Sequence, residues 1–63
     1  MWIISTKYGA FNTDVLEGIR IPAGDYRVVG CGANCRHPIS DNLDDYKKII
    51  KALKNGDNIV EVD

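Results

Sequence analysis

The sequence predicts an α+β fold: an antiparallel sheet of three to four strands, one C-terminal amphipathic helix and an optional final short strand. Two observations carry this prediction. Before residue 40, short runs rich in β-branched and aromatic residues alternate with turns that contain Gly, Pro or Asn, which is typical of successive strands. After residue 40, the apolar residues recur at a helical period. With 63 residues the chain has room for one domain, residues 1–63.

The first hairpin is predicted from residues 2–6, a Trp-Ile-Ile-Ser-Thr run of residue types that favour strands. Residues 7–9, Lys-Tyr-Gly, indicate a turn because Gly9 can take a positive φ. Residues 10–12 are then expected to run back beside the first strand. The chain therefore begins as a β-hairpin in this interpretation.

The middle of the chain is predicted to alternate caps, turns and strands. The Asn-Thr-Asp run at residues 12–14 supplies side chains that cap backbone N–H groups, and one helical turn follows at residues 15–16. Residues 17–21 form a strand. Residues 22–25, Pro-Ala-Gly-Asp, form a turn because Pro fixes φ at a value suited to the turn and Gly tolerates the backbone conformation at which the chain leaves it. Residues 26–31 form the next strand.

A second hairpin is predicted around residues 32–34, Gly-Ala-Asn. This is a three-residue loop in which Asn34 tolerates the left-handed position. Residues 35–39 then return as a short strand. Pro38 donates no N–H, which marks that strand as a sheet edge.

The helix is predicted from one apolar stripe whose members are spaced 3, 3, 1 and 3 residues apart. The stripe consists of Leu43, Tyr46, Ile49, Ile50 and Leu53. Ser40 or Asp41 is expected to cap the start, and aspartates followed by four lysines complement the helix dipole. Gly56 ends the helix, just past its last residue. Residues 58–62 then form the final strand.

Charge and apolar patterning exclude several classes of function. Eight Lys and Arg face nine Asp and Glu, a net charge of −1, which disfavours extended nucleic acid because its phosphates need clustered cations. No apolar run is long enough to span a membrane. The start of the chain lacks the basic region and long apolar stretch of a signal peptide. We therefore expect a cytoplasmic protein without a membrane partner.

Cys31 and Cys35, which the second hairpin places opposite each other, are expected to be free thiols because disulfides are rare in a reducing compartment. Together with His37 they match the first spacing of a zinc site, but structural zinc needs four ligands, and the fourth would be Asp41 or come from another chain. A Cys-x-x-Cys redox motif is absent. A Cys–His catalytic pair would lack an oriented base and an oxyanion site. We expect no metal, no cofactor and no enzymatic activity.

One face of the predicted sheet has no cover. The helix covers the opposite face, so this one is either wet or covered by a second copy. Small domains with thin cores often gain stability by oligomerising, and we therefore expect a homo-oligomer. The final strand, with Ile59, Val60 and Val62, either pairs with a neighbour's edge or docks on its own sheet.

Strand register decides which side chains share the open face. A four-residue loop at residues 22–25 places Arg20 opposite Arg27. The second hairpin, closed as predicted, places Val29 opposite His37. This register keeps four apolar residues on the face under the helix: Ile19, Ile21, Tyr26 and Val28.

Arg20, Arg27 and His37 are the predicted ligand-binding residues, because this register brings them to the open face together. Guanidinium groups suit carboxylate or phosphate oxygens in bidentate geometry, so the set indicates an anion site. The alternative interpretation is that the two arginines extend into solvent or pair with Glu17 and Asp25.

The opening, Met-Trp-Ile-Ile-Ser-Thr-Lys-Tyr-Gly-Ala-Phe-Asn-Thr-Asp, resembles a type of small protein common in phages and mobile elements of low-GC bacteria. Those proteins have a strand, a Gly turn, an Asn-x-Asp turn, further strands and one helix, and the resemblance runs along most of the chain as a pattern. It implies a binding role, since members with known roles are often stoichiometric inhibitors of host defence, including sponges for nucleotide immune signals. The resemblance transfers no functional residue.

Two functions are therefore expected. The first is a non-enzymatic, oligomeric, phage-type protein that sequesters a small anionic, nucleotide-like ligand on the arginine–histidine set. The alternative is a protein–protein inhibitor or adaptor that docks on a host protein through an edge strand or through the acidic start of the helix, Asp41, Asp44 and Asp45. Trp2 either anchors a partner or caps the end of the sheet.

Overall fold

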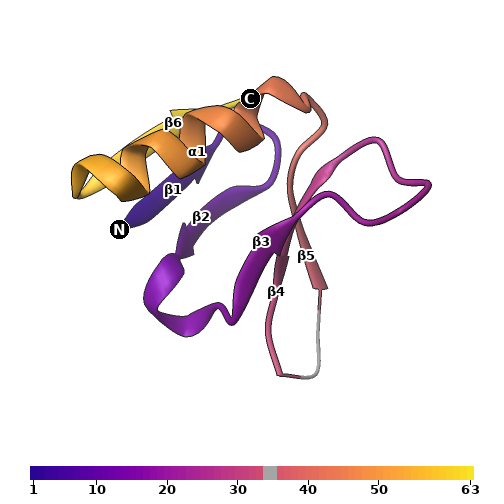
Figure 1. Ribbon diagram of the computed structural model, residues 1–63, viewed down its shortest axis with the longest axis horizontal. Coiled ribbons are helices and arrows are strands. Elements are labelled where there is room, and N and C mark those ends of the chain that lie inside the picture. The colour runs from indigo at the N-terminus through magenta and orange to yellow at the C-terminus, as the bar shows by residue number, and fades with distance from the viewer. Residues whose placement is uncertain (34–35) are drawn as a thin grey trace.

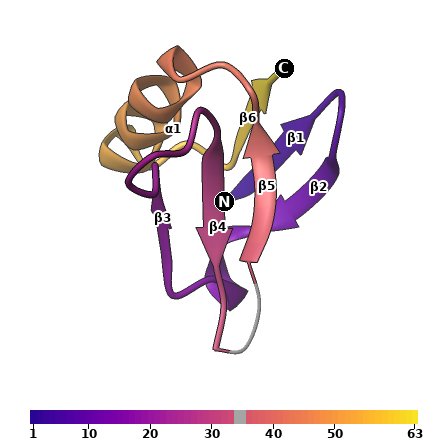
Figure 2. The ribbon, with the colours of Figure 1, turned by 90° about the vertical axis from the view of Figure 1, so that its right-hand side faces the viewer.

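The computed structural model describes residues 1–33 and 36–63 and confirms the α+β class, with the helix and the final strand both present. The strands divide into two three-stranded sheets instead of one (Figures 1 and 2). The first sheet has the order β2-β1-β6 and the second has the order β3-β4-β5. The elements are β1 (Trp2–Ser5), β2 (Gly9–Asn12), the 3-10 turn η1 (Thr13–Val15), β3 (Gly18–Arg20), β4 (Val28–Cys31), β5 (Arg36–Ser40), α1 (Asp44–Asn55) and β6 (Ile59–Val62).

The first sheet is built around β1, which pairs antiparallel with β2 and parallel with β6. The predicted opening hairpin is confirmed, and Gly9 has the positive φ of 99° that its turn requires. The final strand docks on its own sheet, so this alternative for residues 58–62 is confirmed. The parallel pairing of β1 with β6 brings the two ends of the chain into one sheet, because α1 returns the chain across it (Figure 1).

α1 covers the inner face of the first sheet. Its Ile49 and Ala52 pack with Ile3, Val60 and Val62, and all five side chains are buried. The core also takes in Val28 and Ile39 of the second sheet, so the two sheets share one apolar cluster. Burial of this cluster is the main stabilising term for a domain of this size.

The predicted helical stripe is only partly buried. Ile49 is fully buried, but Leu43 and Leu53 keep 41% and 42% of their surface exposed. The helix faces the sheet along Asp45, Ile49 and Ala52 instead. The small Ala52 lets the helix lie close to the sheet, and Asp45 is buried because its carboxylate has polar partners there.

The cap predicted at Ser40 or Asp41 is wrong. The N-cap residue is Leu43, which makes no side-chain cap hydrogen bond, and the preceding Asn42 accepts a hydrogen bond from the Asp44 N–H at its Oδ1 atom, at 3.0 Å. Ser40 is held by a different contact, since its hydroxyl donates to Asp45 Oδ2 at 2.5 Å. The predicted end is confirmed: Gly56 takes a φ of 73° and its N–H binds the last carbonyls of α1.

The second sheet is a local antiparallel meander, but its register differs from the predicted one by two residues between β3 and β4 and by one residue between β4 and β5. Arg20 lies opposite Val29 instead of Arg27, and the pairing of β4 with β5 has a bulge between Val28 and Val29. Ile21 and Tyr26 stay outside the sheet and are exposed, so the chain between β3 and β4 is longer than the predicted turn. The turn itself is present, with the Asp25 N–H donating to the Pro22 carbonyl at 3.0 Å.

Gly30 gives a physical reason for this register. A Cβ on Gly30 would lie 3.0 Å from both Leu16 Cδ1 and Ile39 Cδ1, closer than ordinary van der Waals contact, so a larger residue would require these two side chains to shift. Gly30 stands opposite Ile19 on one side and His37 on the other. The observed register is the one that places this glycine against the side chains of Leu16 and Ile39.

The second hairpin also differs from its prediction. Cys31 stands opposite Arg36, one residue away from the expected register, and the prediction that Cys31 is a free thiol is confirmed. The predicted positions of Asn34 and Cys35 lie outside the described residues. Pro38 does lie in an edge strand, as predicted, because β5 has β4 as its one neighbour in the second sheet.

Candidate functional site

The structure does not bring Arg20, Arg27 and His37 together. Opposite residues of an antiparallel pair share a face, so Arg20 lies on the face of Val29. His37 lies opposite Gly30, one residue further along β4, and therefore belongs to the other face. The expected pairing of Val29 with His37 is wrong, because the one-residue shift between β4 and β5 moves His37 to the face opposite Arg20.

Arg27 is instead part of a charged junction between distant segments. Its Nε atom lies 3.8 Å from Asp25 Oδ1 and 3.9 Å from Asp41 Oδ1. Asp41 also accepts a hydrogen bond from the Tyr8 hydroxyl at 2.6 Å and forms an ion pair with Lys7. The hydrogen bond from Lys7 lowers the pKa of Asp41 below its ordinary 3.8, and Asp41 in turn raises the pKa of Lys7.

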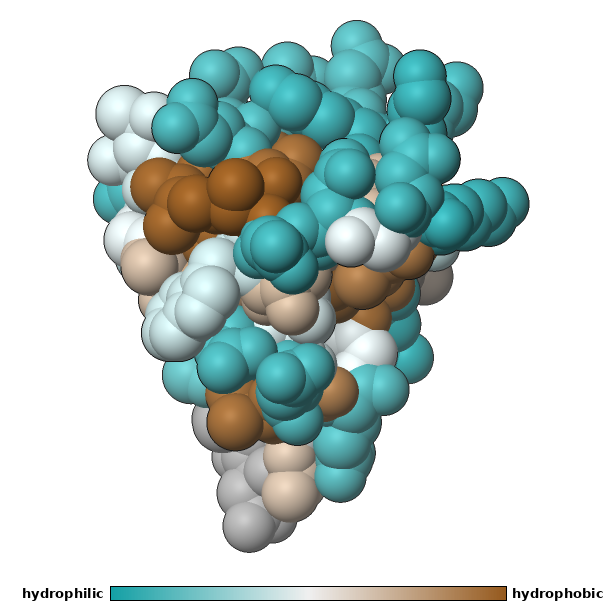
Figure 3. Space-filling model, turned by 90° about the vertical axis from the view of Figure 1, so that its left-hand side faces the viewer, coloured by the Kyte–Doolittle hydropathy of each residue, from teal (hydrophilic) through white to brown (hydrophobic). Residues whose placement is uncertain are grey.

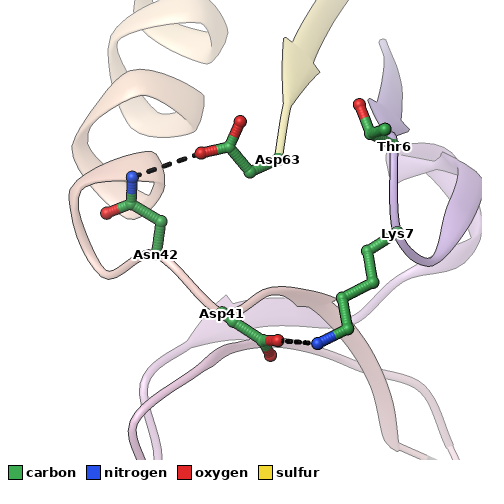
Figure 4. A pocket seen from close by; sticks show the side chains of 5 residues that line it. All are labelled: Thr6, Lys7, Asp41, Asn42 and Asp63. Carbon is green, nitrogen blue, oxygen red and sulfur yellow. Dashed lines mark hydrogen bonds and ion pairs between the residues drawn. The ribbon is translucent and has the colours of Figure 1, made fainter.

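A polar hollow of about 460 Å³ lies beside this junction (Figure 4). Lys7 and Asp41 face each other on one side of it, and Asn42 reaches Asp63 on the other, with 3.4 Å between Asn42 Nδ2 and Asp63 Oδ2. The charged and polar side chains around the hollow already pair with one another. They therefore link the β1–β2 turn to the start of α1. It offers no strong reason to bind a further ligand.

The same contacts restrict the acidic start of the helix as a docking surface. Asp45 is buried and accepts hydrogen bonds from the Ser40 hydroxyl and, at 3.2 Å, from the Asp63 N–H. Asp41 is occupied by Lys7 and its neighbours. Of the three predicted carboxylates, Asp44 alone is exposed without a side-chain partner among the described residues.

A second hollow, here called the inter-sheet cleft, lies between β2, η1 and the tip of the second sheet. Its volume is about 500 Å³. The described lining residues are Trp2, Ala10, Phe11, Asn12, Val15, Leu16, Gly32, Ala33 and His37.

Large side chains that remain exposed line the inter-sheet cleft. Trp2 keeps 48% of its surface exposed and Val15 keeps 75%. Phe11 and His37 meet across the cleft with ring centroids 6.1 Å apart. Figure 3 shows that apolar areas reach the surface on one face of the molecule between hydrophilic side chains. Exposed apolar surface of this kind marks interaction sites in small proteins.

β2 is an edge strand, so one side of it presents backbone hydrogen-bonding groups to the inter-sheet cleft. Thr13 N–H donates to the Met1 carbonyl, so alternate residues of β2 face β1, and Ala10 and Asn12 turn their backbone groups outward. Both of these residues also line the cleft. An unpaired strand edge therefore runs along a hollow with aromatic walls.

The comparisons with known proteins contribute no assignment. Protein-family models, curated proteins and solved structures yield no match to this chain. Within residues 1–33 and 36–63, no group of three or more His, Cys, Asp or Glu is placed to hold a metal ion. No helix in that part of the chain has the length and apolarity needed to cross a bilayer.

Sequence reasoning did not predict the inter-sheet cleft, although it assigned a binding role to two of the residues that line it. Trp2 was expected to anchor a partner or cap a sheet end, and His37 was assigned to an anion site. The missing information was the contact between η1 and the second sheet, which places Val15 and Leu16 beside Trp2. A strand followed by an Asn-capped turn is a pattern that could have indicated β2 as an edge strand. The same pattern gives no information on the apolar residues beside that edge.

Proposed function

We propose that the chain is a small non-enzymatic binding protein that docks on an extended segment of a partner protein. The segment adds to β2 as a further strand, and one of its apolar side chains enters the inter-sheet cleft. The observation that carries this proposal is the coincidence of a free strand edge at Ala10 and Asn12 with a hollow lined by Trp2 and Phe11. Strand addition of this kind draws affinity from backbone hydrogen bonds and specificity from pockets for alternate side chains.

The chemistry of the cleft supports an apolar anchor from the partner. Trp2 and Phe11 offer large, rigid contact area, and aromatic residues are enriched where binding energy concentrates. Val15, at 75% exposure, costs free energy in water and would lose that exposure on docking. This proposal keeps the adaptor or inhibitor alternative expected from the sequence and assigns it to the edge strand β2.

Sequestration of a small anion by Arg20, Arg27 and His37 stays a prediction, although the observed register gives these three residues no common face. The homo-oligomer likewise stays a prediction. A second copy is one of the extended partners that β2 could accept, and the size of the free protein in solution distinguishes it from a foreign partner.

A displayed library of random short peptides, selected on the purified protein, provides the probe. A selected peptide is synthesised and titrated against the wild-type protein and two variants. Val15→Asp places a charge in the cleft at an exposed position, and Leu53→Asp is the matched control, an exposed apolar residue outside the cleft. We expect an affinity loss of about tenfold for Val15→Asp and little change for Leu53→Asp.

Backbone methylation of the peptide tests strand addition without altering the protein. An added strand bonds to β2 through every second residue, so N-methylation should abolish binding at alternate positions and be tolerated at those between. Failure to select any peptide, equal losses in both variants, or insensitivity to N-methylation would each overturn the proposal.

A further inference from the structure

The solvent side of α1 carries a basic surface that the proposed docking site does not use. We call it the lysine face, and it consists of Tyr46, Lys47, Ile50, Lys51 and Lys54, which line a hollow of about 310 Å³. It lies on the helix, whereas the inter-sheet cleft is lined by β1, β2, η1 and the second sheet. The two surfaces share no residue.

The charges of the lysine face are not balanced within the chain. In the part of the chain that the structure describes, every ion pair involves Lys7 or Arg27, so Lys47, Lys51 and Lys54 have no acidic partner within ion-pair distance. Lys51 has a lysine one turn before it and another one turn after it, and like charges at these spacings destabilise a helix. The helix dipole favours Lys54 in the last turn but gives no such benefit to Lys47 near the start.

The floor of the hollow is apolar and fixed. Tyr46 and Ile50 are half-buried, and the Tyr46 side chain also packs against the core. The ammonium groups of Lys47, Lys51 and Lys54 sit on flexible stems around this floor, along about 10 Å of helix axis. A ligand for this surface therefore needs several negative charges around an apolar group.

We infer that the lysine face binds an acidic protein segment that carries an apolar side chain for the hollow between Tyr46 and Ile50. Charge complementarity selects this occupant: three unbalanced cations face outward from a protein whose net charge is −1. That net charge disfavours a long nucleic acid, which needs many phosphate contacts. A bilayer is disfavoured because the apolar side of α1, with Ile49 and Ala52, is buried against the first sheet.

Binding is measured with a labelled synthetic peptide in which Asp and Glu surround one Phe, at about 50 mM salt, where surface charges are weakly screened. The variants are Lys51→Glu, at the centre of the lysine face, and Lys48→Glu, an exposed lysine of the same helix that does not line the hollow. Both make the same change in net charge. We expect Lys51→Glu to weaken binding about tenfold or more and Lys48→Glu to weaken it about threefold or less.

A second peptide with Ser in place of Phe should bind more weakly than the first, because it leaves the apolar floor empty. Equal losses for Lys51→Glu and Lys48→Glu would mean a diffuse charge effect and would overturn the inference. Absence of binding, or tighter binding to a short duplex DNA or to vesicles containing anionic lipid, would also overturn it. Val15→Asp separates this inference from the proposed function, since it should leave binding of the acidic peptide within about twofold.

Discussion

The first sheet with its helix and the second sheet are built in contrasting ways. The first sheet pairs β1 with β6, so it joins residues from the two ends of the chain, and α1 covers its inner face. The second sheet is a meander that spans residues 18–40, and each of its strands pairs with a neighbour in sequence. Loops that close over short distances cost less entropy, so the strand pairings of the second sheet close only short loops, while the β1–β6 pairing of the first sheet spans nearly the whole chain.

The contrast shows that strands close in sequence do not always have a register that can be predicted from the sequence. The meander is local, yet its register departs from the expectation because Gly30 packs under Leu16 and Ile39. The first sheet depends on distant pairing, yet the β1–β2 register follows directly from a turn that ends at Gly9. Packing against a neighbouring element decided the register in the second sheet, and turn chemistry was sufficient in the first.

The largest effect is expected from Ile3→Ala, which breaks the shared core from the side of the first sheet. Ile3 is fully buried among Ile49, Val60 and Val62, and truncating a buried Ile to Ala costs about 2–5 kcal/mol. A domain of 63 residues is stable by roughly 3–9 kcal/mol, so the variant should lose a large share of its free energy of unfolding. Urea denaturation followed by circular dichroism measures this, and a loss below about 1 kcal/mol would contradict the packing described for β1.

An intermediate effect is expected from Gly30→Ala, which tests the second sheet separately. The new methyl group would crowd Leu16 and Ile39, and overpacking of this kind typically costs about 1–3 kcal/mol. Gly18→Ala is the matched control in β3, since a Cβ there meets no atom within 4 Å. Thermal unfolding of both variants should show a lower Tm for Gly30→Ala and an unchanged or slightly higher Tm for Gly18→Ala. Equal shifts would mean that Gly30 does not set the register.

The smallest effect is expected from Asp41→Asn, which weakens the seam that links the start of α1 to the β1–β2 turn. The folded-state pKa of Asp41 is lowered, so its contribution to stability is present above the ordinary carboxyl pKa of 3.8 and is lost as the pH falls through the lowered value. The wild-type protein should therefore have the higher Tm near neutral pH, and the two proteins should converge in acid. A constant difference across the whole pH range would indicate that the Lys7–Asp41 ion pair contributes nothing.

Much of the fold could be predicted from the sequence because its signals are local. Gly9 and Gly56 mark a turn and a helix end through backbone conformations that few other residues adopt, and both take a positive φ in the structure. The division into two sheets could not be predicted, because it depends on the parallel pairing of β1 with a strand more than fifty residues away. The helix starts after Leu43 instead of after Ser40 or Asp41, whose side chains are engaged by Asp45 and by Lys7 and Tyr8.

Less of the candidate site could be predicted. The arginine–histidine set depended on a register that side-chain packing overrode, and Arg27 is drawn instead to Asp25 and Asp41. The inter-sheet cleft unites Trp2 and Val15 with the tip of the second sheet, three segments that no sequence pattern connects. The sequence shows that the lysines follow the aspartates along the helix, an order that complements the helix dipole. That these lysines have no acidic partner among the described residues could be seen only in the tertiary structure.

The parallel pairing of β1 and β6 has a mechanical consequence. The chain enters the first sheet at one end of β1 and leaves it at the opposite end of β6, so the two termini lie at opposite ends of adjacent strands (Figure 1). A force that pulls the termini apart would slide these strands past each other and strain the Trp2–Asn58 and Thr6–Val62 backbone hydrogen bonds at the same moment. Force spectroscopy on the chain held by its ends should therefore give a single sharp rupture instead of gradual unzipping, and this protein would resist tension better than its small core suggests.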